Sequence, residues 1–275
     1  MQYVRYQSGE EIAYGILKGD SIQRIQGDLF DSPVVTDTLL STKDCQLLPP
    51  CQPSKIIGIG MNFKHLFSSE NEYPKYPRLF LKLPTSVVGP YDTVSYPTLV
   101  TATIFEAELA VVIGRKARDV PQQEARDYVL GFTGMNDISS REYLHSDLSD
   151  QGPGDAIVKA CDEFAPMGPC IDTEVDPRNV QLRAWLNGEL KQDHNTSDLI
   201  FDVDQVVSYV SRVFTLHPGD VIIHNSAYHG ASHGPDVAFI VPVFVDGDTL
   251  GDADGDLLVC TGNCTSKFRS TCSIL

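Results

Sequence analysis

Two glutamates stand two residues apart in an otherwise apolar segment, residues 103–113. If this segment is a strand, its alternate side chains share a face, so Glu106 and Glu108 point the same way, about 7 Å apart. Like charges on an apolar strand repel and are costly to bury, and a divalent cation removes both problems. Asp137 offers a third carboxylate further along the chain. Three carboxylates without Cys or His favour a hard cation, Mg²⁺ first, with Mn²⁺ or Ca²⁺ as substitutes.

An interpretation without metal stays open. The two glutamates could line a solvated strand face, or one of them could pair with Arg115 or Lys116. Two acidic residues separated by one position are a weak signal on their own. The apolar character of the alternate positions in the same segment is what favours a buried cation site.

The elements that must position these carboxylates are mostly strands. Residues 103–113 are predicted as one long strand. Residues 120–130 carry a helix signal, with a proline in the first turn and a glycine after the end. The dipeptide at 187–188, Asn-Gly between two apolar runs, predicts a hairpin. Residues 202–214 are the strongest helix prediction, because valines recur at helical spacing behind Asp202, a favoured N-cap type.

Composition and hydrophobic periodicity change along the chain and predict three zones. Residues 1–50 contain short polar–apolar alternations with Gly and Asp turns, which indicates a small N-terminal domain of strands. Residues 55–250 form the main domain, and residues 251–275 are a tail with little periodicity. Strands outnumber helices and do not alternate regularly with them. The predicted class is therefore α+β, strand-rich and mixed, rather than a doubly wound parallel sheet.

Composition excludes several partner classes. The 275 residues hold 21 Lys plus Arg and 37 Asp plus Glu, a formal net charge of −16, which argues against nucleic acid and anionic membranes. No apolar run approaches the roughly 20 residues that span a bilayer. No signal or transit peptide is visible, and the 7 cysteines lack a pairing pattern. We expect a cytoplasmic protein with a small-molecule substrate.

Several motifs follow one another in the order found in a known enzyme family. They read PSKIIGIGMNF at 53–63, EAELAVVIG at 106–114, GFTGMNDISSR at 131–141, KACDEFAPMGP at 159–169, NGELKQDHNT at 187–196 and LHPGDVI at 216–222. Together they resemble the fumarylacetoacetate hydrolase (FAH) family over roughly residues 1–250. Each motif alone has little specificity, but the ordered set is highly specific.

The resemblance implies a function and a set of site residues. It assigns the metal carboxylates to Glu106, Glu108 and Asp137, a substrate-carboxylate contact to Arg141 and a catalytic lysine to Lys159. Its enzymes act on 2-oxo or 1,3-dicarbonyl compounds, whose enolate a Lewis-acid cation stabilises. The family also implies a homodimer and one rolled, barrel-like sheet. Outside its motif, Lys159 would be read as a solvated lysine, and the alternative for Arg141 is a structural ion pair.

Two segments depart from the family pattern. The family has a His four residues after the motif Asn and a Glu three residues later, whereas here His65 comes three after Asn62 and Ser68 stands in the Glu position. Without that Glu, His65 lacks the partner that fixes its tautomer, so hydrolysis is the step most in doubt. The substrate loop at 224–234 keeps a hydroxyl in Ser226 but adds Tyr228, which indicates a different or larger substrate.

Several alternatives remain open at this point. The enolate could lead to C–C hydrolysis, decarboxylation or tautomerisation, and the last two tolerate the altered His segment better. The protein could instead be an isomerase or cyclase of polyketide-like metabolism, or a metal-binding homologue without catalysis. The final residues Cys272-Ser273-Ile274-Leu275 fit a prenylation signal. Because few basic residues precede them, we expect an unmodified tail.

Overall fold

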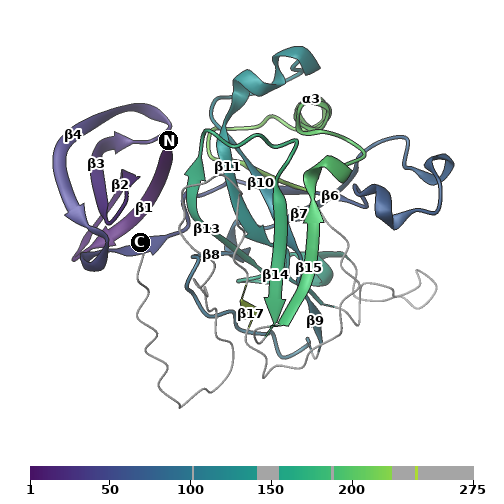
Figure 1. Ribbon diagram of the computed structural model, residues 1–275, viewed down its shortest axis with the longest axis horizontal. Coiled ribbons are helices and arrows are strands. Elements are labelled where there is room, and N and C mark those ends of the chain that lie inside the picture. Colours follow the sequence, from purple (N-terminus) through teal and green to yellow (C-terminus); the bar gives the residue numbers. More distant parts are fainter. Residues whose placement is uncertain (101, 141–154, 187–188, 225–238, 241–275) are drawn as a thin grey trace.

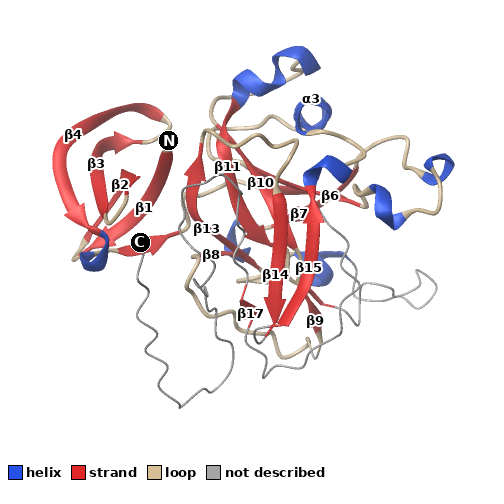
Figure 2. Cartoon of the chain, viewed as in Figure 1, coloured by secondary structure: helices blue, strands red, loops and turns tan. Residues whose placement is uncertain are grey.

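The computed structural model describes residues 1–100, 102–140, 155–186, 189–224 and 239–240. Strands dominate these residues, as predicted (Figure 2). The strands are β1 Gln2–Ser8, β2 Glu11–Lys18, β3 Ser21–Asp28, β4 Asp31–Ser41, β5 Gln46–Leu48, β6 Ile56–Gly60, β7 Arg78–Lys82, β8 Val87–Val88, β9 Thr103–Ile104, β10 Ala107–Ile113, β11 Val129–Asn136, β12 Ser139–Ser140, β13 Ala165–Asp172, β14 Gln181–Leu186, β15 Glu189–Asn195, β16 Val221–His224 and β17 Phe239–Ile240. The α-helices are α2 Asp155–Lys159 and α3 Val203–Val213.

One mixed sheet of 12 strands links most of the described chain in the order β4-β3-β2-β1-β13-β11-β10-β16-β6-β7. Strand β5 pairs with β1, and β8 pairs with β13. The strands β1 to β4 form an antiparallel meander at the purple end of the chain in Figure 1. The pairings among the described strands end at β4 and β7 without closing a ring, so the barrel-like form stays a prediction.

Apolar side chains cover both faces of the central strands. Along β10, Leu109 and Val111 join a cluster that includes the buried face of α3. Ala110 and Val112 join a second cluster on the other face, with residues of β6, β13 and β16. All seven residues of β10 are buried. A strand covered on both sides reads as continuous apolar sequence, and that is the pattern of this segment.

Helix α3 confirms its prediction, with the expected N-terminal signal. The side chain of Asp202 accepts a hydrogen bond from the backbone N–H of Gln205, and the Gln205 side chain accepts one from the N–H of Asp202. This reciprocal capping satisfies two amide groups that the first helical turn leaves unpaired. The hairpin prediction is also confirmed, because β14 and β15 pair antiparallel around residues 187–188.

Two element predictions were wrong. Residues 120–130 do not form an α-helix; a 3₁₀ helix covers Gln122–Tyr128, and β11 begins at Val129. Residues 103–113 are not one strand but β9 and β10, interrupted at Phe105 and Glu106. At this interruption, side chains rather than a neighbouring strand's backbone satisfy the backbone hydrogen-bonding groups. Asn136 accepts from the backbone N–H of Glu106, and Gln192 bonds both the N–H and the carbonyl of Ala107.

Candidate active site

The three predicted metal carboxylates lie together at one end of the central strands. Glu106 immediately precedes β10, Glu108 lies within it, and Asp137 immediately follows β11. The antiparallel pairing of β10 with β11 brings them together, and the Asp137 N–H donates to the Glu106 carbonyl at 2.8 Å. One ligand oxygen from each residue lies within 4.8 Å of the others. All three residues are buried, so the structure builds a compact acidic cluster away from bulk water.

Glu108 is the residue whose surroundings best fit a bound cation. It is fully buried, and neither carboxylate oxygen has a hydrogen-bond partner among the described residues. Burial raises the pKa of this carboxyl well above its usual range, and repulsion from Asp137 and Glu106 raises it further. An ionised carboxylate left in this position is costly unless a positive charge compensates it. A divalent cation with oxygen ligands fits this donor set.

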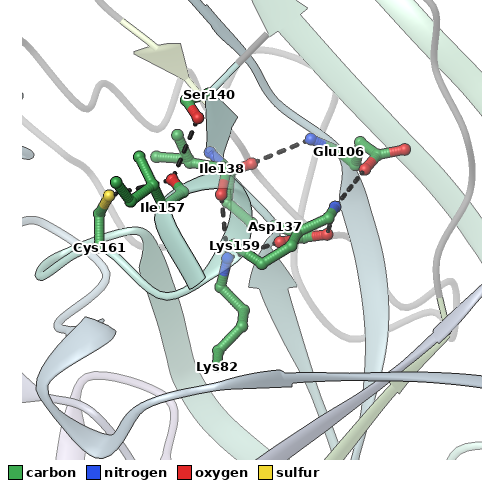
Figure 3. Close-up of polar contacts among 9 residues, drawn as sticks. Lys82, Glu106, Asp137, Ile138, Ser140, Ile157, Lys159 and Cys161 are labelled. Atoms are coloured by element: carbon green, nitrogen blue, oxygen red, sulfur yellow. Dashed lines mark hydrogen bonds and ion pairs between the residues drawn. The ribbon is translucent and has the colours of Figure 1, made fainter. Parts of the chain in front are cut away.

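Two lysines complete the charge cluster (Figure 3). Lys159, the last residue of α2, donates to Asp137 Oδ2 and lies 3.3 Å from Glu106 Oε2. Lys82, the last residue of β7, donates to Asp137 Oδ1 at 2.6 Å and to the Ile138 carbonyl at 2.9 Å. Two ammonium groups thus face three carboxylates, so the cluster carries one uncompensated negative charge when all five groups are ionised.

The two lysines differ in how the site sets their charge. Burial would lower the pKa of Lys159, but the carboxylates of Asp137 and Glu106 outweigh burial and raise it, so this ammonium keeps its proton. At Lys82, which no water reaches, burial outweighs the attraction of Asp137 and lowers the pKa. The ring of Phe80 lies under the Lys159 ammonium at 4.7 Å and excludes water on that side.

Sequence reasoning missed Lys82. The feature that marks Lys82 as a site residue is its position at the end of β7, where it pairs across the sheet with the fully buried Ile56. A lysine opposite a buried isoleucine needs a partner carboxylate, because an unpaired buried charge is strongly unfavourable. The sequence does not reveal which residue it opposes, since that depends on the pairing register of β6 and β7.

His65 lies apart from the acidic cluster and has its own carboxylate partner. Its Nδ1 is 2.7 Å from Asp198 Oδ2, and its ring stacks on His194 at 4.3 Å between centroids. The expectation that this histidine lacks a carboxylate partner was therefore wrong. Asp198 is 133 residues away along the chain, so no local motif could reveal the pair.

A second histidine, His224, is the last residue of strand β16. His224 is fully buried next to Leu109, and burial lowers its pKa to about 4, so its ring is neutral. Its Nδ1 lies 3.2 Å from the side-chain nitrogen of Asn62 and accepts from it, since an amide nitrogen has no lone pair to offer. Nε2 of His224 has no partner among the described residues.

Arg141, Ser226 and Tyr228, predicted to bind substrate, lie outside the described residues. The same holds for Cys272 and the rest of the tail. The structure therefore brings together Glu106, Glu108, Asp137 and Lys159 from the predicted set. None of the helices in the described ranges has the length and apolar character needed to span a bilayer.

Comparison with known proteins defines the class of the molecule. Residues 55–250 match the family model "Fumarylacetoacetate (FAA) hydrolase C-terminal", and residues 1–50 match "Rv2993c-like, N-terminal". The chain belongs to the fumarylacetoacetate hydrolase family, as the motif order indicated.

Three relatives illustrate the range of the family. "Protein Rv2993c" of Mycobacterium tuberculosis is 33% identical over 91% of this chain and 92% of its own length. The 2-hydroxyhepta-2,4-diene-1,7-dioate isomerase of Mycobacterium marinum superposes with a TM-score of 0.75 at 32% identity, covering 88% of this chain and 93% of that one. The mitochondrial oxaloacetate tautomerase fahd2 of Xenopus laevis is 36% identical over 67% of this chain and 59% of its own length. The chain spans 59% to 70% of the length of several such relatives.

Proposed function

We propose that this protein is a divalent-cation-dependent enzyme that interconverts keto and enol forms of a 2-oxo or 1,3-dicarbonyl acid. The observation that carries the proposal is the buried cluster of Glu106, Glu108 and Asp137, with Lys159 held against two of them. Burying charged groups of this kind costs desolvation free energy, and the binding of a ligand of opposite charge offsets that cost.

The three carboxylates would hold the cation, with Mg²⁺ as the first candidate and Mn²⁺ or Ca²⁺ as substitutes. A bound divalent cation supplies Lewis-acid stabilisation of negative charge that develops on a substrate oxygen. Lys159 keeps its proton and donates a hydrogen bond to the same developing charge. Lys82 holds Asp137 through its Oδ1 atom, which fixes the carboxylate in place. The Phe80 ring keeps water from one side of the lysine.

The choice of tautomerisation or isomerisation among the reactions of an enolate rests on the relatives. Both an isomerase and an oxaloacetate tautomerase are similar to this chain. Such reactions need one proton moved and no water attacking carbon. Hydrolysis of the same substrate class is the second candidate, because a maleylpyruvate hydrolase shares the fold. Decarboxylation starts from the same enolate chemistry and is a further candidate from the sequence. A homodimer in the cytoplasm remains the expectation of the sequence.

A substrate panel tests the proposal. Oxaloacetate, acylpyruvates and fumarylacetoacetate are each supplied to EDTA-treated protein, with and without added Mg²⁺, and the products are identified. We expect ketonisation of an enol substrate to depend on both protein and cation. Cation without protein is the control, because Mg²⁺ alone acts on such compounds. Full turnover in EDTA would exclude the cation mechanism, and a cleaved product would assign hydrolysis or decarboxylation instead. Cation binding with no turnover on any substrate would favour the non-catalytic homologue.

A further inference from the structure

Strand β7 presents two side chains to the acidic cluster from the same face. Phe80 and Lys82 are two residues apart in β7, so their side chains lie on one side of the sheet. Lys82 donates to Asp137 Oδ1 at 2.6 Å, and the Phe80 ring centroid lies 4.7 Å from the Lys159 nitrogen. The aromatic ring is therefore part of the surroundings of the cluster, although it brings no polar group to it.

The Phe80 ring occupies space that a glycine leaves open. Gly58 in β6 pairs directly with Phe80 in β7. A Cβ atom on residue 58 would overlap the tip of the ring, at Cζ and both Cε atoms. Gly58 does not have a positive φ, so an alanine could adopt its backbone conformation. The ring, rather than the backbone, is therefore what requires a glycine at this position.

Two carboxylates and the aromatic ring surround the Lys159 ammonium. The ammonium donates to Asp137 Oδ2 and lies 3.3 Å from Glu106 Oε2. The ring of Phe80 lies against it as well. Lys159 is buried, and the attraction between a cation and an aromatic face is stronger in a desolvated site than at the surface.

Cation–π contacts elsewhere in the described chain lie in a different environment. Arg115 lies over the Tyr128 ring at 4.6 Å, and Arg126 lies over the Phe132 ring at 5.5 Å. These arginine side chains are 59% and 42% exposed, whereas that of Lys159 is 10% exposed. Water screens the arginines, so the contact of Lys159 is the one expected to affect chemistry.

The ring differs from the carboxylates in what it can bind. Glu106 and Asp137 belong to the acidic cluster that could hold a cation. A divalent cation on these carboxylates would offset their attraction for the Lys159 ammonium and would itself repel it. An aromatic ring is not a ligand for a hard cation that prefers oxygen. Phe80 is therefore a partner of Lys159 for which the cation does not compete.

We propose that Phe80 is a positioning residue for Lys159: its ring, packed against Gly58, holds the ammonium beside the carboxylates while they bind the cation. This inference rests on the proposed function, in which Lys159 donates a hydrogen bond to the charge that develops on a substrate oxygen. The ring acts through the lysine, and Gly58 acts through the ring.

NMR tests the contact without any substrate. In protein labelled with ¹³C-lysine, the methylene protons beside the Lys159 ammonium should be shifted upfield by the ring current of Phe80. Lys159→Met identifies their signal by its loss. Phe80→Leu should return the signal to the ordinary lysine position, and Gly58→Ala should reduce the shift with the ring still present. Added Mg²⁺ should leave the wild-type signal upfield. An ordinary position in wild type, with or without Mg²⁺, would overturn the inference even if the enzyme is active.

Kinetics then tests the effect on turnover. On whichever panel substrate is turned over, Phe80→Leu should lower kcat about 10-fold. KM should change less than about twofold, because the ring acts through a lysine that serves the transition state. Phe132→Leu is the matched control, since it removes a buried ring beside an exposed arginine, and it should keep the wild-type kcat. Unchanged kcat in Phe80→Leu, or an equal loss in both variants, would reject the assignment.

A fluorinated ring separates attraction from packing. With 2,6-difluorophenylalanine in place of Phe80, the fluorines lie on the Cδ atoms, away from the tip that packs on Gly58, and they weaken the negative potential of the ring face. We expect a kcat between those of wild type and Phe80→Leu. A wild-type kcat would reject the attraction between ring and ammonium. Absence of wild-type turnover would count against the proposed function, while the NMR result would still decide the contact between Phe80 and Lys159.

Discussion

The N-terminal meander and the central strands each contain an ion pair between a basic and an acidic side chain, and the two pairs differ in their exposure to water. In the meander, the Arg24–Glu11 pair joins β3 to β2 with both side chains exposed, 37% and 51%. In the centre, Lys82 and Asp137 pair with no exposure at all. Strand β4 is almost wholly exposed, whereas β10 is buried on both faces. Water screens the first pair, and its absence makes the second pair important for stability and chemistry.

The comparison teaches where function can be expected in such a sheet. Exposed ion pairs contribute about 0–1 kcal/mol, because water solvates each partner almost as well as the other partner does. Buried charges lose that solvation, so a cluster of them persists only where partners or ligands compensate. The same residue change should therefore have very different effects in the two regions.

The largest effect is expected from removing a central carboxylate. Glu108→Ala should abolish cation binding, measured by calorimetry, together with turnover. The matched change in the meander, Glu11→Ala, removes an exposed carboxylate of the same type and should leave both measurements at wild-type values. Cation-dependent turnover that survives Glu108→Ala would remove this residue from the site.

The next comparison sets Lys159 against His65. Lys159→Met removes the donor aimed at the developing charge and should lower kcat about 10³-fold, within the range for such donors. His65→Gln removes the histidine to which the family resemblance assigns acid–base chemistry, and kcat should fall about 10²-fold. Steady-state kinetics on the panel substrate gives both values. A greater loss in His65→Gln would raise hydrolysis above tautomerisation.

Breaking the two ion pairs should sharpen the contrast in stability. Lys82→Met leaves Asp137 buried with one partner fewer and should lower the free energy of unfolding by about 3–5 kcal/mol. Arg24→Met, in the exposed pair, should lower it by about 0–1 kcal/mol. Urea unfolding in EDTA measures both. Equal losses would mean that Lys82 is better solvated than its burial indicates.

The smallest effect concerns pH. The folded-state pKa of Glu108 lies above its unfolded value, so this group contributes stability below its unfolded pKa and loses it as pH rises through the folded pKa. Glu108→Gln removes the charge and should stabilise the cation-free protein by about 1 kcal/mol at high pH. Melting curves from pH 5 to 9, about the range in which the protein can be handled, would show the difference growing with pH. Added Mg²⁺ should stabilise wild type and not the variant.

The acidic triad could be read from the chain because its information is local. Glu106 and Glu108 share a short apolar segment, and the motif around Asp137 is distinctive in composition. Helix α3 was equally accessible, because its apolar spacing and its capping residues lie within a few positions of each other. The interruption before β10 could not be predicted from the sequence. The side chains of Asn136 and Gln192, which lie far along the chain, accept the backbone hydrogen bonds of Glu106 and Ala107 there.

The sequence by itself determined the family, the strand-rich class and the residues that could hold a cation, since each depends on residue types at short spacing. Only the tertiary structure decided that Lys82 reaches Asp137 and that Asp198 holds His65. Those contacts join residues 55 and 133 positions apart, and they depend on strand register and on the packing of separate turns. Composition and periodicity are silent about such pairs, because burial and proximity arise only when the sheet has formed.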